Sequence, residues 1–147
     1  MQVADAQVVE ALERLVTAAV GLTTVALGEA GVASELTLPQ WRILVVVAQS
    51  DGSRVGEVAA RIGVSLPAAS RLVRRLERRG LVTAIRDERD RRATIVRPTE
   101  AGFRLWEDVA GRRRRRLVAA LEVLQEPLPA GFGRGLELVV GVLEKRA

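Results

Sequence analysis

The chain has 147 residues, of which 48% are hydrophobic and 28% charged, and its formal net charge is +5. One domain is expected at this length, with enough apolar side chains for a core. The absence of cysteine excludes a disulfide framework, a thiolate metal site and a thiol redox switch.

The N-terminal part predicts a long helix over residues 6–29. Residues 1–5 lack the basic and then apolar regions of a signal peptide, and no run approaches the ~18 apolar residues of a membrane span. We therefore expect a cytoplasmic protein with no membrane partner. The apolar positions of the helix are spaced 4-3-4-3-4, which is typical of a subunit interface. They are Val8, Leu12, Leu15, Ala19, Leu22 and Ala26.

A second helix is expected to start after Thr37. Thr37 can cap its first turn, and Gln40, three residues on, can complete a capping box. The inward face of this helix is predicted to carry Trp41, Leu44, Val45 and Ala48.

Two short helices then predict a helix-turn-helix. Apolar residues at i, i+3, i+4 and i+7 indicate a helix over 55–62 that ends at Gly63. Ser65 can cap a second helix, over 66–79, and Pro67 is tolerated in its first turn. The apolar stripe of that helix is Ala69, Leu72, Val73 and Leu76, and Arg71, Arg74, Arg75 and Arg78 lie opposite.

A β-hairpin is expected after Gly80, which should end the helix as a left-handed cap. Residues 81–86 and 93–97 are short runs rich in Val, Ile and Thr, and the charged tip 87–92 joins them. Helix, turn, helix and hairpin together predict a winged helix over 53–98. This segment carries twelve arginines and five acids, whereas residues 1–52 have a net charge of −4 and residues 99–147 of +2. The positive charge is therefore concentrated where nucleic acid would bind.

Two further helices complete the chain. Thr99 caps a long helix that is expected to run to about Gln125 and includes the five arginines 112–116. Arg113 should lie near its apolar side. The run could contact DNA phosphate, an acidic partner helix or an anionic ligand, but a solvated face paired with nearby glutamates is the preferred interpretation. In the last helix Phe132, Leu136, Val139 and Leu143 repeat at 4-3-4, so we expect residues 6–29 and 115–146 to form a homodimer.

The order and spacing of these segments resemble the MarR family of bacterial transcriptional regulators. The similarity covers essentially the whole chain: the opening Leu-Thr-Leu-Pro-Gln-Trp (36–41), the segments 58–64 and 76–82, and above all the wing 87–92 followed by 97–102. Pro98 replaces the leucine that is usual in the family at the entry to the long helix. The fold class implied is mainly α with a small antiparallel β-hairpin wing, a winged helix-turn-helix with N- and C-terminal dimerisation helices, in a single domain over 1–147.

The resemblance implies a dimeric repressor that binds a pseudo-palindromic operator in double-stranded DNA and is released by a small-molecule effector. The recognition helix 66–79 would enter the major groove, where arginine can bind guanine, and the wing 87–92 the minor groove. Asp90 would brace the wing. In the family, effectors lie between the dimerisation helices and the winged helix, which makes Trp41, Phe103 and Trp106 candidate walls; ordinary core packing is the alternative for each. The expected DNA-binding residues are Ser65, Pro67, Ala68, Ser70, Arg71, Arg74, Arg75, Arg89, Arg91 and Arg92.

The sequence also bears on two other function classes. An enzyme would have to work without His, Cys or Tyr, and the one carboxylate cluster, at 87–90, lies among arginines that can pair with it, so neither a metal nor a cofactor is expected. An architectural DNA-binding protein without sequence preference would use the same arginines for backbone contacts. Competition with random DNA separates this class from a regulator, which should prefer its own site by ~10³ or more.

Overall fold

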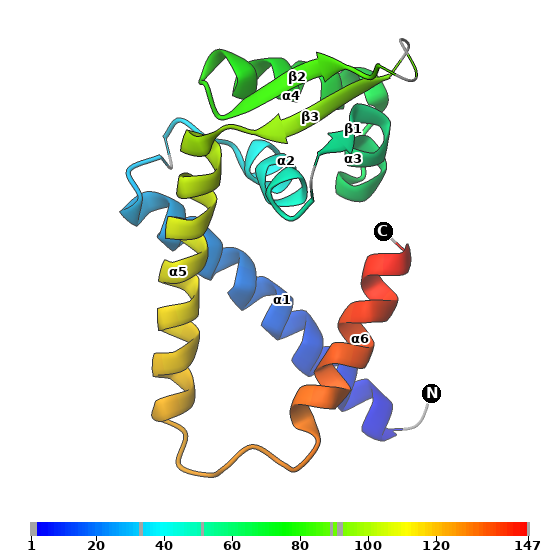
Figure 1. Cartoon of the computed structure of the whole chain (residues 1–147). Coiled ribbons are helices and arrows are strands. Elements are labelled where there is room, and N and C mark those ends of the chain that lie inside the picture. Colours follow the sequence, from blue (N-terminus) through cyan, green and yellow to red (C-terminus); the bar gives the residue numbers. More distant parts are fainter. Residues whose placement is uncertain (1–2, 33, 51, 89, 91–92, 147) are drawn as a thin grey trace.

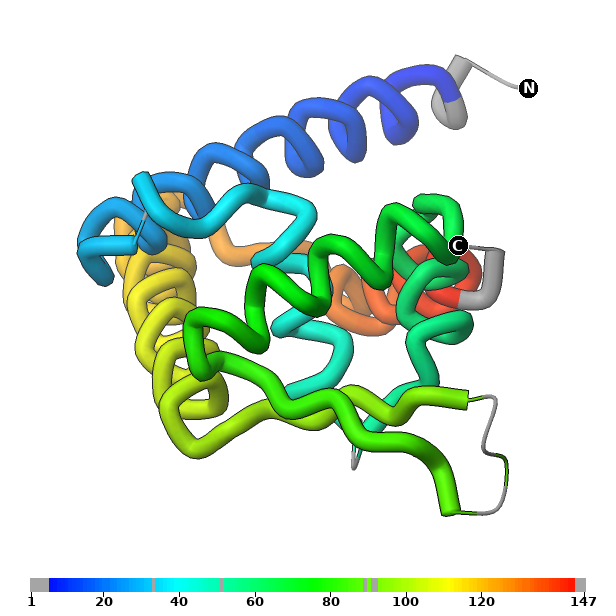
Figure 2. Tube along the Cα trace, turned by 90° about the horizontal axis from the view of Figure 1, so that it is seen from above, coloured from blue at the N-terminus to red at the C-terminus, as the bar shows by residue number. Residues whose placement is uncertain are grey.

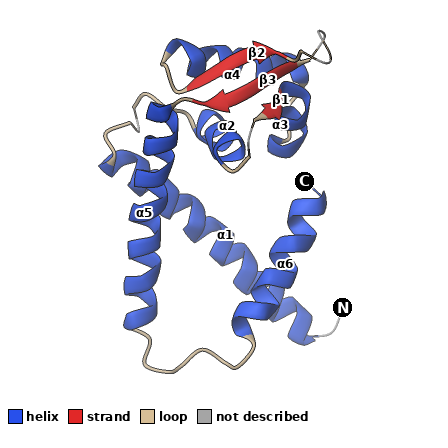
Figure 3. Cartoon of the chain, in the orientation of Figure 1, coloured by secondary structure: helices blue, strands red, loops and turns tan. Residues whose placement is uncertain are grey.

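The computed structural model describes residues 3–32, 34–50, 52–88, 90 and 93–146. Figure 1 shows a lobe of short helices and a small sheet, from which the longer helices extend to one side. The fold is the expected winged helix-turn-helix, mainly α (Figure 3). Its elements are α1 (Val3–Glu29), α2 (Leu38–Ala48), β1 (Ser53–Arg54), α3 (Val55–Ile62), α4 (Leu66–Arg78), β2 (Val82–Arg86), β3 (Thr94–Pro98), α5 (Glu100–Glu122) and α6 (Phe132–Arg146).

Helix α2 forms the centre of the core. The expected capping box is present, since the Thr37 amide donates to Gln40 Oε1 at 2.9 Å and the Gln40 amide donates to Thr37 Oγ1 at 3.5 Å. Ile43, Leu44 and Val47 of α2 are fully buried. Around them lie the apolar faces of the other elements of the lobe, with Val58, Ile62, Ala69, Val73, Leu76, Val82, Val96 and Val109.

The sheet has three strands rather than the two of the expected hairpin. Strand β1 is only two residues long and pairs with β3, Ser53 opposite Val96 and Arg54 opposite Ile95, in the order β1-β3-β2. A two-residue strand has no alternation that a sequence pattern could reveal. Strands β2 and β3 pair antiparallel as the expected hairpin, with Val82 opposite Pro98 at one end and Arg86 opposite Thr94 at the other.

The ends of the helices differ slightly from expectation. Helix α1 begins at Val3 instead of residue 6. Helix α5 ends at Glu122 rather than near Gln125, and Val123 is its C-cap. Gly80 has φ of 67°, the left-handed conformation expected after α4.

Helices α1, α5 and α6 leave much apolar surface exposed within the single chain. Val16 of α1 is 59% exposed, Leu121 of α5 54% and Leu138 of α6 67%. Helix α6 overlaps α1 in Figure 1, but Figure 2, turned by 90°, shows the two helices well apart. The sequence analysis expected no membrane span, whereas residues Ala6–Glu29 are long and apolar enough to cross a membrane by length and composition alone. A single such helix is weak evidence, because a core helix of a soluble protein or a signal sequence passes the same test.

Candidate nucleic-acid interface

Helix α4 is positioned by its cap and by one apolar face. The Ala68 amide donates to Ser65 Oγ at 3.4 Å, and Pro67 lies in the first turn, as expected. Ala69, Val73 and Leu76 are buried against the core, which fixes the rotation of the helix about its axis. The opposite face therefore faces solvent along the whole length of α4.

The solvent face of α4 is a row of arginines. Arg71, Arg74, Arg75 and Arg78 are all exposed, and within the described part of the chain none of them forms a salt bridge with an acidic residue. Together with Glu77 they line a shallow hollow. Four guanidinium groups that have no acidic partner among the described residues form, on one helix face, a strongly positive surface that suits a polyanion.

The remaining α4 residues named from the sequence lie around the first turn. Ser65 and Pro67 are exposed, and Ala68 and Ser70 are partly buried. The Ser70 hydroxyl donates to the Leu66 carbonyl at 2.9 Å, so it still has lone pairs to accept another hydrogen bond. Directly after the helix, Arg79 forms an ion pair with Glu35 at 3.8 Å. Arg79 thus differs from the four arginines of the solvent face, which have no acidic partner among the described residues.

The wing is closed at its base by backbone hydrogen bonds. The Asp87 amide donates to the Ala93 carbonyl at 3.0 Å, and the Ala93 amide to the Asp90 carbonyl at 2.8 Å. Three of the expected DNA contacts, Arg89, Arg91 and Arg92, lie outside the described residues.

Asp87, a member of the carboxylate cluster at 87–90, pairs at the wing base with Arg54, an arginine outside the tip of the wing. Its carboxylate accepts a hydrogen bond from the guanidinium of Arg54 at 2.8 Å, and its residue is 8% exposed. Asp90, expected to brace the wing, lies 4.0 Å from the same guanidinium.

A side chain also connects the recognition helix to the sheet. The Ala84 amide in β2 donates to Glu77 Oε1 of α4 at 3.2 Å. Because β2 is an edge strand, this amide has no neighbouring strand to pair with on that side. Helix α4 and the hairpin lie side by side in Figure 2 and are joined through this contact.

The three aromatic residues expected at a ligand pocket do not share one cavity. Trp41 is only 2% exposed in the core, whereas the rings of Phe103 and Trp106 on α5 lie with their centroids 5.4 Å apart and their planes tilted by 43°. Trp106 borders a cleft of about 670 Å³ between α1 and α5, and its buried indole N–H has no partner among the described atoms. The cleft is further lined by Ala19, Leu22, Glu107, Ala110, Gly111, Arg113, Arg114 and Leu117.

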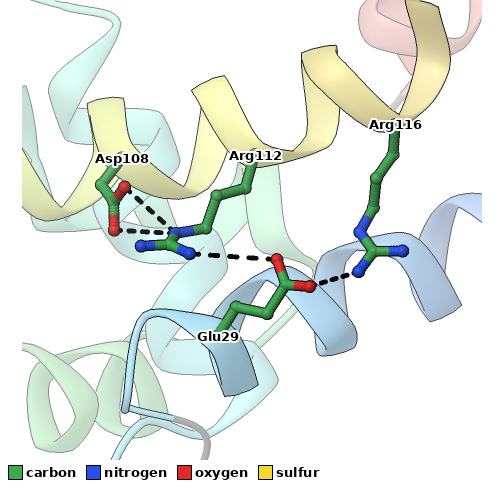
Figure 4. Close-up of polar contacts among 4 residues, drawn as sticks. All are labelled: Glu29, Asp108, Arg112 and Arg116. Atoms are coloured by element: carbon green, nitrogen blue, oxygen red, sulfur yellow. Dashed lines mark hydrogen bonds and ion pairs between the residues drawn. The ribbon is translucent and has the colours of Figure 1, made fainter. Parts of the chain in front are cut away.

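Two of the five consecutive arginines at 112–116 lie within ion-pair distance of a glutamate, as expected from the sequence. This glutamate belongs to another helix. Glu29, at the end of α1, forms an ion pair with Arg116 and lies 4.0 Å from Arg112, which also pairs with Asp108 at 3.0 Å (Figure 4). Arg113 donates to Thr23 Oγ1 at 3.4 Å beside the apolar cleft, so it lies near the apolar side of α5 as expected. These contacts attach α5 to the C-terminal end of α1.

No metal site is formed by the residues that the structure describes, since no group of three or more Asp or Glu is arranged to hold an ion.

The contacts missed from the sequence join residues far apart along the chain. Arg54 and Asp87 are 33 residues apart, and Glu29 and Arg116 are 87 apart. A weak local signal existed only for Arg54: it directly precedes a helix with Glu57 three residues on, and its amide donates to Glu57 Oε2 at 3.0 Å.

Comparison with known proteins agrees with this geometry. Residues 34–93, which comprise α2 and most of the winged helix, match the model of the MarR family. The transcriptional activatory protein BadR of Rhodopseudomonas palustris is 37% identical over 81 residues, which are 53% of this chain and 46% of BadR. The chain thus aligns with less than half of this relative.

Solved structures share the fold over nearly the whole chain. RV1404 from Mycobacterium tuberculosis superposes with a TM-score of 0.82 at 22% identity, covering 97% of this chain and 95% of RV1404. NadR in complex with 4-hydroxyphenylacetate superposes with a TM-score of 0.71 at 23% identity, covering 99% and 94% of the two chains.

Proposed function

We propose that the chain is a transcriptional regulator of the MarR family, whose model matches residues 34–93, and that it acts as a homodimeric repressor which binds a pseudo-palindromic operator. In this proposal α4 enters the major groove and the wing at 87–92 the minor groove. The observation that carries it is the row of exposed arginines on α4, because the described residues offer them no acidic partner.

The arginines of α4 divide into two roles. Arg71 lies in the second turn, close to the helix N-terminus, which in helix-turn-helix proteins is the part that contacts base edges. Ser65, Pro67, Ala68, Ser70, Arg74 and Arg75 surround it and approach the bases or the backbone. Arg78, near the end of the helix, reaches phosphate only.

A second copy of the chain is proposed to cover the exposed apolar faces of α1, α5 and α6. Residues 6–29 and 115–146 present large apolar side chains that their own chain leaves exposed, including Val16, Leu121 and Leu138. Burial against a copy would remove this surface from water, which is favourable by roughly 25 cal/mol per Å². Two-fold symmetry would also place two α4 helices about one DNA turn apart, ~34 Å. The apolarity of α1 is then that of an interface helix in a cytoplasmic dimer with no membrane partner.

A small-molecule effector is proposed to release the DNA. NadR, which shares the fold, is bound to 4-hydroxyphenylacetate. In this chain the cleft beside Trp106 offers an apolar wall and an indole N–H without a described partner, and the Phe103 ring lies in tilted contact with the same indole. Trp41, buried in the core, would act on such a site only through packing.

The test is a comparison of two arginine variants on a library of duplexes at two salt concentrations. Arg71→Ala should lose ~1–3 kcal/mol of specific binding and relax the preference at one base pair of each half-site. Arg78→Ala, matched in charge and on the same helix, should weaken binding to every sequence alike and lower the salt slope by about one. Equal losses on every sequence, with specificity intact in both variants, would refute the assignment of Arg71 to base readout.

A further inference from the structure

We propose that Arg54 is a positioning residue for DNA binding: it holds the wing in a fixed place relative to the helix-turn-helix, so that both can reach their grooves together. This inference rests on the proposed DNA-binding function, and Arg54 itself is not among the residues proposed to contact DNA.

The position of Arg54 in the sheet directs its side chain to the wing base. Arg54 in β1 is paired with Ile95 in β3, and Ile95 is paired on its other side with Ile85 in β2. Paired residues point to the same face of a sheet, as do residues two apart in one strand. Asp87 follows Ile85 by two residues, so it continues the same face. The long arginine side chain therefore extends from one edge strand past β3 to the end of the other edge strand.

The contact at that point is close and largely sheltered. The guanidinium Nη2 donates to Asp87 Oδ2 at 2.8 Å, and Nη1 lies 4.0 Å from Asp90 Oδ2. The Asp87 side chain is only 11% exposed, against 47% for Arg54, so water screens the carboxylate end poorly. Two carboxylates, one before and one within the turn of the wing, thus lie around one guanidinium.

The backbone of Arg54 is in turn fixed to the first helix of the helix-turn-helix. Its amide donates to Glu57 Oε2 at 3.0 Å, and the residue directly precedes α3. The Arg54 side chain therefore links α3 to the wing base, in addition to the backbone pairing of β1 with β3. Since a segment that is ordered before binding loses less conformational entropy on binding, loosening the wing should weaken its grip on DNA without affecting base readout by α4.

A direct phosphate contact is the rival role for an arginine at this place, and charge separates the two. Arg54→Ala removes a positive charge and Asp87→Asn removes a negative one, so a phosphate contact predicts opposite effects on DNA affinity. A positioning role predicts that both variants weaken binding. The double variant should then be no weaker than either single variant by more than ~2-fold, because the two changes remove the same interaction.

The experiment uses the full chain and two duplexes. A duplex that the wild-type protein selects from a random library is rebuilt with A·T-rich or with G·C-rich flanks, since a narrow minor groove attracts arginine. Arg104→Ala serves as the control, because it removes the same charge and an ion pair, that with Glu100. Arg104 lies near the start of α5, which follows the end of β3 opposite the wing. In the free protein, NMR-detected exchange of the Asp87 and Ala93 amides reports on the wing base itself.

We expect Arg54→Ala and Asp87→Asn each to weaken binding to the A·T-flanked duplex ~5-fold. Binding of each variant to the G·C-flanked duplex should change by less than ~2-fold, and the dependence of affinity on salt concentration should stay the same. Both should speed exchange of the two amides ~5-fold or more, and Arg104→Ala should do neither. Tighter binding by Asp87→Asn, a slope lowered by one in Arg54→Ala, or unchanged amide exchange would overturn the inference. A wild-type protein indifferent to its flanks would refute the minor-groove placement of the wing, while the exchange rates still decide whether Arg54 holds the wing base.

Discussion

Replacement of Gly102 by alanine tests how rigidly the winged helix is joined to α5. The Gly102 amide donates to Thr99 Oγ1 at 3.0 Å in the first turn of α5. A Cβ at this position would overlap the Leu81 carbonyl oxygen and lie 2.9 Å from its carbon and 3.2 Å from Leu44 Cδ1. Because the obstacle is backbone, the start of α5 must move. That movement would strain the hydrogen bonds from Thr99 to the carbonyls of Leu81 (3.1 Å) and Gly80 (2.5 Å).

The size of the effect follows from opposing contributions. Alanine in a helix is favoured over glycine by up to ~1 kcal/mol. Overpacking against backbone opposes this by ~1–3 kcal/mol, and weakening of the cap by about 1 kcal/mol more. We expect a net loss of ~2 kcal/mol, which for a chain of this size lowers the melting temperature by roughly 4–8 °C.

A second glycine of the same helix provides the control. A Cβ at Gly111 meets only Arg115 Nη1 at 3.6 Å, an ordinary contact, so Gly111→Ala should stabilise the protein by ~0.5–1 kcal/mol. Urea and thermal unfolding are to be compared at one protein concentration, because the stability of a dimer depends on it. A Gly102→Ala protein as stable as Gly111→Ala would refute the close approach of α5 to Leu81.

Three further changes test other parts of the structure. Leu76→Ala should lower the free energy of unfolding by ~2–5 kcal/mol in a urea titration, because this side chain is fully buried on the core face of α4. A loss under ~1 kcal/mol would contradict its place in the core. Deletion of residues 1–29 should give aggregated or unfolded protein by size-exclusion chromatography, since it exposes the partner's apolar face; a soluble, monomeric product that binds DNA would refute the dimer. Mild peroxide should not release DNA in a binding assay through thiol chemistry, because the chain has no cysteine; release that a thiol reductant reverses would show this reasoning to be wrong.

The helices of this fold could be predicted because their signals are local. Capping by Thr37, Ser65 and Thr99 and the left-handed Gly80 gave the helix boundaries to within a few residues. Strand β1 could not be predicted, because two residues carry no periodicity, and it exists only through its pairing with β3.

The candidate site was predictable only in part, for a related reason. The exposed face of α4 follows from its helical period, since burial of Ala69, Val73 and Leu76 leaves the arginines outside. The ion pairs of Arg54 with Asp87 and of Glu29 with Arg116 join distant segments, and no spacing rule relates them. Whether an aromatic residue packs in the core, as Trp41 does, or borders a cleft, as Trp106 does, likewise depends on which helix covers it.

Sequencing of DNA bound to the purified protein, selected from random duplexes at fixed salt, tests the central claim most directly. A homodimer that reads DNA with α4 should enrich an inverted repeat whose half-sites are centred ~10 base pairs apart, with a preference over random DNA of ~10³ or more. Recovery of no common sequence, with affinity governed by salt alone, would contradict site-specific recognition and indicate an architectural DNA-binding protein.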